Sequence, residues 1–415
     1  MRRRTRRRVG AAGALVALGI LVAPARAEPP GEPRTAATTA SDPGAPGPRA
    51  AGLEAQGRYE EAAEAYAEAL FAAGWRGPDA PAQAARLVEL RLALGEPARA
   101  AAVVAELERL PGVVPPATLA LLLLRLSERH ERYGEATAAL EVLGPARLEA
   151  LLAAPVDLRV RLHAARGRAL RALGRPWEAQ AEYARVEALW PGPAQVTAAI
   201  RATVDAEPPA VAPSLGAPGE GTGDLRVERR LGAALAAVSE AVFRRADGAV
   251  TPAATAPPPR YVGPDDDAAI RRFIDGEVKR WVNARSRALE EAMTGYKAVV
   301  DLRPVPSPIW VVEAAARVGE LWGDFATAVQ AVPVPPTVRR DPALVRLYRT
   351  ALAEATAPWL ERARGAMQTC VGYAARYQLA SPASDRCAAW LGGHFPDRFP
   401  PLDELRPAPG WAPPL

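Results

Sequence analysis

Between residues 50 and 204 the chain repeats one local pattern four times. Each copy has a turn, a small residue on the segment that follows, a larger residue four positions later and an apolar residue three positions after that. The turns contain Gly57, Gly95, Gly134 and Gly174. The small residues are Ala62, Ala100, Ala136 and Ala179. Successive alanines lie 100 − 62 = 38, 136 − 100 = 36 and 179 − 136 = 43 residues apart, which is the size of one helical hairpin.

The packing of two antiparallel helices explains this pattern. Glycine ends the first helix and lets the chain reverse, because it adopts the left-handed conformation without strain. Alanine on the second helix lets two backbones approach closely, and the residue four positions later lies one turn along the same face. One hairpin cannot bury its apolar face alone, so such hairpins stack on one another. The sequence therefore predicts an all-α fold of stacked hairpins over residues 50–204.

At these residues the chain resembles the tetratricopeptide repeat family. The best local match runs from Gly57 through Ala62, Tyr66 and Ala69 to Leu70. The fourth copy adds Gly167 in its first helix, Tyr183, and Pro191 at its close. The resemblance implies an α-solenoid that binds other proteins. The copies are longer than the family's usual unit of about 34 residues, so no ligand-binding residue is carried over from it.

The C-terminal part predicts longer helices. Residues 205–223 are rich in Pro, Gly and Ala and are predicted to be a linker, which is followed by a helical repeat-like domain over residues 224–395. Apolar residues at helical spacing predict one long helix from Ile270 to Val300, started by the acidic run 265–267. Its end repeats the hairpin pattern at Ala292 and Tyr296, which predicts a fifth hairpin. Further helices are predicted from about residue 307, over 341–378 and over 382–393.

Residues 290–392 are similar to large repeat proteins of the myxobacterial cell envelope, including ones associated with gliding motility. The similarity lies in the helix containing Tyr296, the helix with Trp310 and Arg317-Val318-Gly319, a proline-rich loop and a pair of cysteines around a final tryptophan. It implies a role in an envelope assembly and supplies no catalytic residue. The tryptophans in this region, Trp310, Trp322, Trp359 and Trp390, are predicted to pack in the core.

The N-terminus has the three parts of a secretory signal peptide. Six arginines between Arg2 and Arg8 precede an uncharged apolar run, Val9–Val22, and Ala25-Arg26-Ala27 has the small-x-small form of a cleavage site. Residues 1–27 are therefore predicted to be removed on export, by the general route or by the twin-arginine route, which the segment Thr5–Val9 resembles. Residues 28–49 are rich in Pro, Gly, Ala, Ser and Thr and are predicted to be a disordered tail, and residues 396–415 are a proline-rich tail.

Removal of the signal peptide changes the charge of the chain. The whole chain has a net charge of +5, and residues 1–27 contain seven arginines and no acid, so the exported part has 5 − 7 = −2. A negative net charge does not favour nucleic-acid binding. No apolar segment long enough to span a membrane remains after cleavage, because a spanning helix needs about 20 residues.

Cys370 and Cys387 are the two cysteines of the chain. Export favours a disulfide between them, which would hold the last helix against its neighbour. The alternative is two separate buried thiols. Their spacing is not that of a Cys-x-x-Cys redox motif.

No catalytic or metal-binding constellation stands out in the sequence. His130, His163 and His394 are far apart, and none has a second ligand at zinc-binding spacing. His130 falls at a predicted helix end, and His163 lies among arginines on a face predicted to be solvated. The sequence predicts neither an enzyme nor a cofactor.

These observations favour an exported protein–protein interaction scaffold, located in the periplasm, the cell envelope or outside the cell. Its predicted partners are other envelope proteins or peptides, bound in a groove between stacked hairpins. A part in a motility or envelope assembly is the more specific form of this hypothesis. The alternatives are a cell-wall-acting enzyme or its helper subunit, and a carrier of a small ligand or lipid. A large apolar cavity would favour the carrier, whereas a packed core with an open groove would favour the scaffold.

Overall fold

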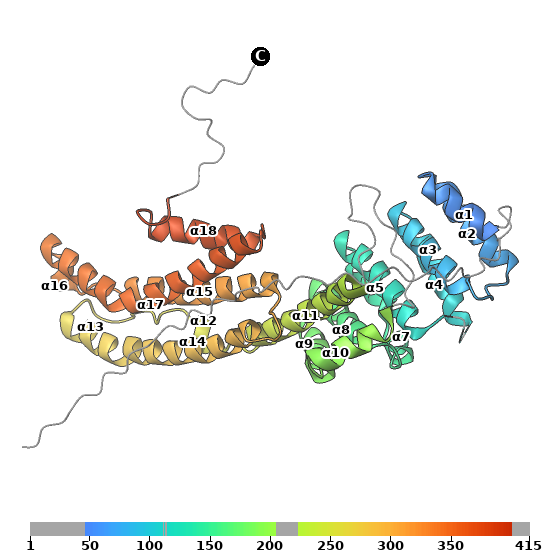
Figure 1. Cartoon of the computed structure of the whole chain (residues 1–415). Coiled ribbons are helices and arrows are strands. Elements are labelled where there is room, and N and C mark those ends of the chain that lie inside the picture. Colours follow the sequence, from blue (N-terminus) through green and yellow to red (C-terminus); the bar gives the residue numbers. More distant parts are fainter. Residues whose placement is uncertain (1–45, 111, 113, 205–222, 401–415) are drawn as a thin grey trace, which may run out of the picture. The chain divides into compact units, whose positions relative to one another are not determined.

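The computed structural model describes residues 46–110, 112, 114–204 and 223–400, and within these ranges every regular element is a helix. The predicted signal peptide lies outside the described residues, as do 28–45, 205–222 and 401–415. Residues 46–49, predicted to belong to the N-terminal tail, instead form the start of a helix. In chain order (Figure 1) the helices are α1 (Pro46–Ala55), α2 (Tyr59–Ala72), α3 (Ala80–Ala93), α4 (Pro97–Arg109), α5 (Pro116–Arg132), α6 (Ala136–Val142), α7 (Pro145–Ala150), α8 (Val156–Ala172), α9 (Pro176–Leu189), α10 (Pro193–Arg201), α11 (Gly223–Gly248), α12 (Pro252–Thr255), α13 (Asp267–Phe273), α14 (Lys279–Val300), α15 (Pro308–Gln330), α16 (Pro336–Arg339), α17 (Pro342–Arg376) and α18 (Pro382–His394).

Four helical hairpins occupy the predicted repeat region: α1–α2, α3–α4, α5–α6 and α8–α9. Each turn has its glycine in the left-handed region, with φ of 76° at Gly57, 78° at Gly95, 74° at Gly134 and 71° at Gly174. The hydrogen bonds are the same in all four. The glycine N–H bonds to the carbonyl three residues back, and the next N–H bonds to the carbonyl five residues back. This is the Schellman motif, which satisfies carbonyls that the helix end leaves free.

The packing register is counted from these glycines. The residue five positions after each glycine is a buried alanine, and the residue four positions further on is buried as well. The alanines are Ala62, Ala100, Ala139 and Ala179, and the residues that follow are Tyr66, Val104, Leu143 and Tyr183. The prediction of Ala136 for the third hairpin is therefore wrong, because Ala136 is only half-buried whereas Ala139 is fully buried. With this correction the alanines lie 100 − 62 = 38, 139 − 100 = 39 and 179 − 139 = 40 residues apart.

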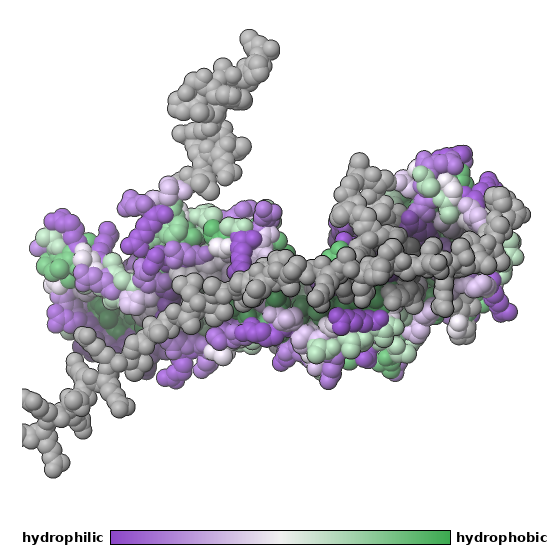
Figure 2. Space-filling view, in the orientation of Figure 1, coloured by the Kyte–Doolittle hydropathy of each residue, from purple (hydrophilic) through white to green (hydrophobic). Residues whose placement is uncertain are grey.

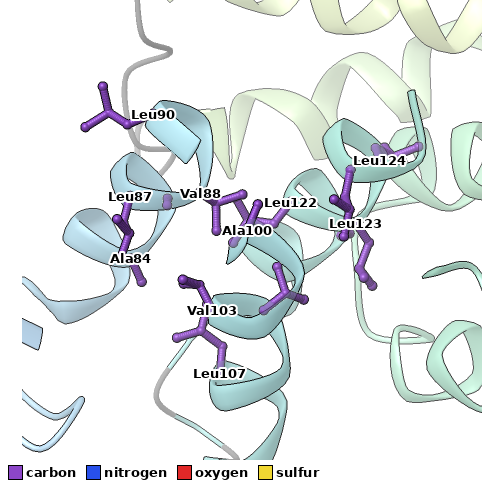
Figure 3. Packing of buried hydrophobic residues seen from close by; sticks show 14 of the residues in the cluster. Ala84, Leu87, Val88, Leu90, Ala100, Val103, Leu107, Leu122, Leu123 and Leu124 are labelled. Atoms are coloured by element: carbon purple, nitrogen blue, oxygen red, sulfur yellow. The ribbon is translucent and has the colours of Figure 1, made fainter. Parts of the chain in front are cut away.

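Side chains from successive hairpins fill one apolar core. Figure 3 shows Val103 and Leu107 of α4 between residues of α3 and residues of α5, among them Leu87 and Leu123. These side chains are nine-tenths or more buried. Ala69 of α2, predicted to pack in this region, is also buried.

The position twelve residues before each buried alanine lies on the first helix of the hairpin. The larger the residue that follows the alanine on the second helix, the smaller the residue at this position. Ala50 corresponds to Tyr66, Val88 to Val104, Ser127 to Leu143 and Gly167 to Tyr183, and all are buried. In the fourth hairpin, a Cβ atom on Gly167 would lie 2.9 Å from ring atoms of Tyr183. Gly167 therefore provides the space that the Tyr183 ring occupies.

Replacing Gly167 by Ala is expected to lower the free energy of unfolding. Forcing a methyl group into the Tyr183 ring costs about 1–3 kcal/mol, and the higher helix propensity of alanine returns about 1 kcal/mol, so we expect a net loss of up to about 2 kcal/mol. Chemical denaturation measures it. The matched control is Gly232→Ala in α11, where nothing lies within 4 Å of the new Cβ and alanine should stabilise the helix. Equal stabilisation by both substitutions would contradict the assigned packing.

Helix α11 lies against α8 and α9, so the helices on the two sides of residues 205–222 share a core. Apolar residues of α8, α9 and α11 form one buried cluster that includes Val160, Tyr183 and Val238. One buried and one partly buried ion pair also join α11 to α8. Arg230 donates to both carboxylate oxygens of Asp157 at 2.9 and 2.8 Å, and Arg168 donates to Glu240 at 2.8 Å.

The C-terminal helices confirm most of the predicted boundaries. The segment predicted from Ile270 to Val300 is α13, a π-helical turn over Ile274–Val278, and α14, and the side chain of Asp266 caps α13 by accepting from the Ala269 N–H. The predicted helices after residue 307, over 341–378 and over 382–393 are α15, α17 and α18. Trp322 is 1% exposed, and Trp310, Trp359 and Trp390 pack against the same core, as predicted.

The predicted fifth hairpin at Ala292 is wrong. Ala292 is half-buried in the middle of continuous α14, and no turn precedes it, although Tyr296 is buried and donates to Asp247. The turn pattern recurs instead between α17 and α18. Gln378 has a φ of 52°, and the Leu379 N–H bonds to the Ala374 carbonyl five residues back. Ala383 follows five positions later and Cys387 four positions after it, and both are fully buried.

The predicted disulfide is present between Cys370 of α17 and Cys387 of α18. Both residues are fully buried in a cluster with Val312, Met367 and Leu391. The bond fastens α18 to α17 inside the last hairpin.

Candidate functional site

The third hairpin is interrupted in its second helix. α6 has seven residues, whereas α2, α4 and α9 have 14, 13 and 14. The helix ends before Gly144-Pro145, where Pro145 cannot continue it and instead begins α7. Arg166 of α8 donates to the Leu143 carbonyl at 2.6 Å, so the freed helix end is satisfied by a side chain.

A half-open groove of about 640 Å³ lies beside this interruption, between α7, α8 and α9. Its walls are mostly apolar, and Leu152 is 62% exposed on the α7 side. The lining residues are Pro145, Leu148, Glu149, Leu152, His163, Arg166, Leu170, Glu178, Ala181, Glu182, Arg185, Ala188 and Leu189.

One buried carboxylate organises the polar part of the groove. Glu182 of α9 is 4% exposed, and its Oε2 lies 2.7 Å from His163 Nδ1. Its other oxygen accepts from Arg166 Nε at 3.2 Å and from Arg185 Nη1 at 2.6 Å. Burial opposes ionisation of Glu182, but the hydrogen bond from His163 and the nearby positive charges outweigh it, so its pKa lies below the ordinary value. The carboxylate is therefore ionised at neutral pH and His163 Nδ1 carries the proton.

The prediction that His163 lies on a solvated face is wrong, because its side chain is 17% exposed and paired with Glu182. This partner could not be predicted from the sequence, because it is 19 residues away on another helix. One feature of the sequence could have indicated a polar site here: helical spacing places Glu178, Glu182 and Arg185 on one face of α9. The pair holds the imidazole in one orientation, with Nε2 left to meet a partner group. None of the described residues that line the groove is a serine, threonine, cysteine or lysine that could act as a nucleophile.

The other two histidines lie apart from this groove. His130 is in the last turn of α5, as predicted, and contacts Glu135 at 2.7 Å. His394 is in the last turn of α18 and stacks on Trp390. Across residues 46–110, 112, 114–204 and 223–400, no group of three or more His, Cys, Asp or Glu side chains could hold a metal ion.

The predicted repeat-packing residues build the scaffold and do not line the groove. Gly57, Gly95 and Gly174 are in the turns, and Ala179 and Tyr183 are buried behind the α9 wall. Pro191 follows the end of α9, where Trp190 is already extended, and so closes the hairpin as predicted.

A second hollow of about 810 Å³ lies between the proline-rich loop 257–265 and the segment 331–339, which includes the short helix α16. An ion pair between Arg339 of α16 and Asp265 joins the two segments. The charged side chains that line it, Arg260, Asp265 and Arg339, are all exposed. It lacks the buried, oriented polar group that marks the groove beside α7.

No family model matches the chain, and no curated protein matches it either. No helix among the described residues is both long and apolar enough to cross a membrane.

Proposed function

We propose that the protein is an exported scaffold of the bacterial cell envelope that binds a helical segment of another protein in the groove between α7, α8 and α9. The hairpins form a tetratricopeptide-like solenoid in this proposal. The groove is its recognition site, and its partner is another envelope protein, as in a motility or envelope assembly.

The observation that carries the proposal is the shortened α6 beside the groove. In a stack of hairpins, the second helix of one hairpin packs against the next hairpin, and α6 does contact α8. Because α6 is about two turns shorter than its counterparts, the face of α8 and α9 that these turns would cover is left as a groove. An amphipathic helix supplied by a partner would fill this space.

The chemistry of the groove also supports a protein ligand. Leu148, Leu152 and Leu189 offer apolar contacts along the walls, and Glu182 with His163 offers an oriented polar group at the floor. A few convergent polar groups between apolar walls are typical of specific recognition. A lipid carrier would need a larger apolar cavity, and we propose no catalytic role because the lining residues in the described part include no nucleophilic hydroxyl or thiol.

Two features support export. The arginine-rich start followed by an apolar run has the form of a signal peptide, and the buried Cys370–Cys387 disulfide is a feature of proteins in oxidising compartments.

Photo-crosslinking in the living bacterium tests the proposed function. A photoreactive residue in place of Leu152, which is exposed in the groove, is expected to capture an exported or envelope protein through one helical segment. The same residue in place of Leu347, which is 66% exposed on α17, is the position control and should not capture that protein.

Filling the groove provides the matched comparison. Ala181 and Ala188 line the groove and are exposed, so Trp at either position should lower the crosslink yield at least tenfold without disturbing the core. Ala184 is exposed on the same helix but does not line the groove, so Ala184→Trp should leave the yield unchanged. Capture that is equal in all three variants, or capture of no envelope protein, would overturn the proposal.

A further inference from the structure

The turns of the third and fourth hairpins expose large apolar side chains that the fold does not use. Trp177, in the first turn of α9, is 87% exposed, Tyr133 at the end of α5 is 60% exposed, and Leu173 in the α8–α9 turn is 36% exposed. A single exposed apolar residue is ordinary, but two aromatic residues and a leucine at neighbouring turns indicate a contact surface. The structure places no described side chain over Trp177.

The two turns lie side by side. Arg168 Nε, near the end of α8, donates to Glu131 Oε2 at 2.9 Å near the end of α5. Arg168 also donates to the buried Glu240 of α11, so its position is held from two sides. We define the tip edge as Arg129, Arg132, Tyr133, Arg171, Leu173 and Trp177.

The free charge of the tip edge is positive. Of the acids around it, Glu131 pairs with Arg168 and Glu178 pairs with Arg175 at 2.6 Å, whereas Glu135 contacts His130, which is charged only when protonated. Arg129, Arg132 and Arg171 therefore outnumber the one carboxylate that has no arginine beside it. Arg132 and Arg171 are exposed and form no ion pair with any described residue. The Arg129 guanidinium lies over the Tyr133 ring, which holds an aromatic face and a cation at one point of the surface.

We propose that the tip edge docks on the surface of a bilayer that contains anionic phospholipids. Trp and Tyr favour the zone between headgroups and acyl chains, because their rings are apolar with one polar atom. Arginine binds phosphate oxygens through two N–H groups, and basic residues next to apolar ones hold proteins at anionic membranes. A membrane suits Trp177 better than a protein pocket does, because the side chain stands clear of any wall. The tip edge and the groove use different residues, so this inference does not depend on the proposed function.

Vesicle flotation tests the docking with the purified protein as it is after export, since the arginine-rich residues 1–27 would bind membranes by themselves. We expect binding to vesicles of equal parts phosphatidylglycerol and phosphatidylcholine at low salt, at least tenfold weaker binding at high salt, and little binding to phosphatidylcholine alone. Trp177→Ala with Tyr133→Ala, and separately Arg132→Gln with Arg171→Gln, should each weaken binding about tenfold or more.

The control variants replace an exposed aromatic residue and an exposed arginine that lie outside the tip edge. Phe71 is 82% exposed at the end of α2, and Arg346 is exposed on α17, so Phe71→Ala and Arg346→Gln should leave vesicle binding unchanged. Circular dichroism of each variant should match that of the parent protein, because every substitution is on the surface. Absence of binding to anionic vesicles, or equal weakening by the controls, would overturn the proposal. So would a photoreactive residue at position 177 that captures a protein and no lipid in the cell.

Discussion

Replacing Asp157 by Ala is expected to lower the free energy of unfolding by roughly 3–5 kcal/mol, because a buried guanidinium loses the carboxylate that neutralises it. Asp157 is fully buried, and the side chain of its partner Arg230 is 7% exposed. Arg230 makes two parallel hydrogen bonds to the carboxylate and a third, of 3.1 Å, to Thr203. Because the pair joins α8 to α11, the loss should be largest there. Chemical denaturation gives the magnitude, and hydrogen exchange along α11 gives the location.

Two further variants separate the ion pair from the general effect of a substitution. Replacing both partners with apolar residues, Asp157→Leu with Arg230→Met, should restore much of the stability, because no buried charge then remains. Asp301→Ala is the matched surface control, since Asp301 pairs with Lys297 but about half of its side chain is exposed, and exposed pairs contribute little. If Asp157→Ala were as mild as Asp301→Ala, the buried pair would not be what fastens α11 to α8.

Replacing Cys370 and Cys387 together by Ala is expected to destabilise the last hairpin by about 3 kcal/mol. The two residues are 17 apart in sequence, and closing a loop of about that size contributes this much in the chain-entropy model. The effect should be local, because α18 packs mainly on α17 and α15 among the described helices. Hydrogen exchange should rise in α18 and in the C-terminal part of α17, while the hairpins of residues 46–189 keep their protection.

Reduction of the parent protein should reproduce the effect of the double substitution, and the reductant should have no further effect on the double variant. Thiol counting without reductant provides the direct check. Two reactive thiols, counted after unfolding the purified native protein without reductant, would contradict the bond.

The sequence predicted the hairpins because their determinants are local. A glycine in each turn and apolar residues at helical spacing need no distant partner to be recognised, and all four turns form the same hydrogen bonds. The choice of Ala136 over Ala139 failed because the segment Ala136-Thr137-Ala138-Ala139 offers three alanines within one turn of helix. Residue type alone does not distinguish these alanines. The turn at Gly134 sets the helical register, and this register places Ala139 on the buried face of α6.

The predicted fifth hairpin failed for a related reason. Ala292 and Tyr296 have the right spacing, but no residue before them ends the helix, so α14 continues through the site. The real turn of this kind contains Gln378, which adopts the left-handed conformation without being a glycine. The left-handed conformation of Gln378 costs free energy, and the packing of α18 on α17, together with the disulfide, offsets this cost.

For the two cysteines, the sequence favoured a disulfide but left two separate buried thiols as the alternative. The class of this fold, the boundaries of most helices and the core positions of Tyr66 and Tyr183 could be predicted from the sequence. These depend on periodicity and on single residues whose effect is local. The tertiary structure alone decided which residues meet across helices: Asp157 with Arg230, Arg168 with Glu131, and His163 with Glu182. Such pairs join residues 19 to 73 positions apart, and no helical period relates them. For this reason the groove beside α7 and the tip edge could not be predicted from the sequence, although the sequence contains all of their residues.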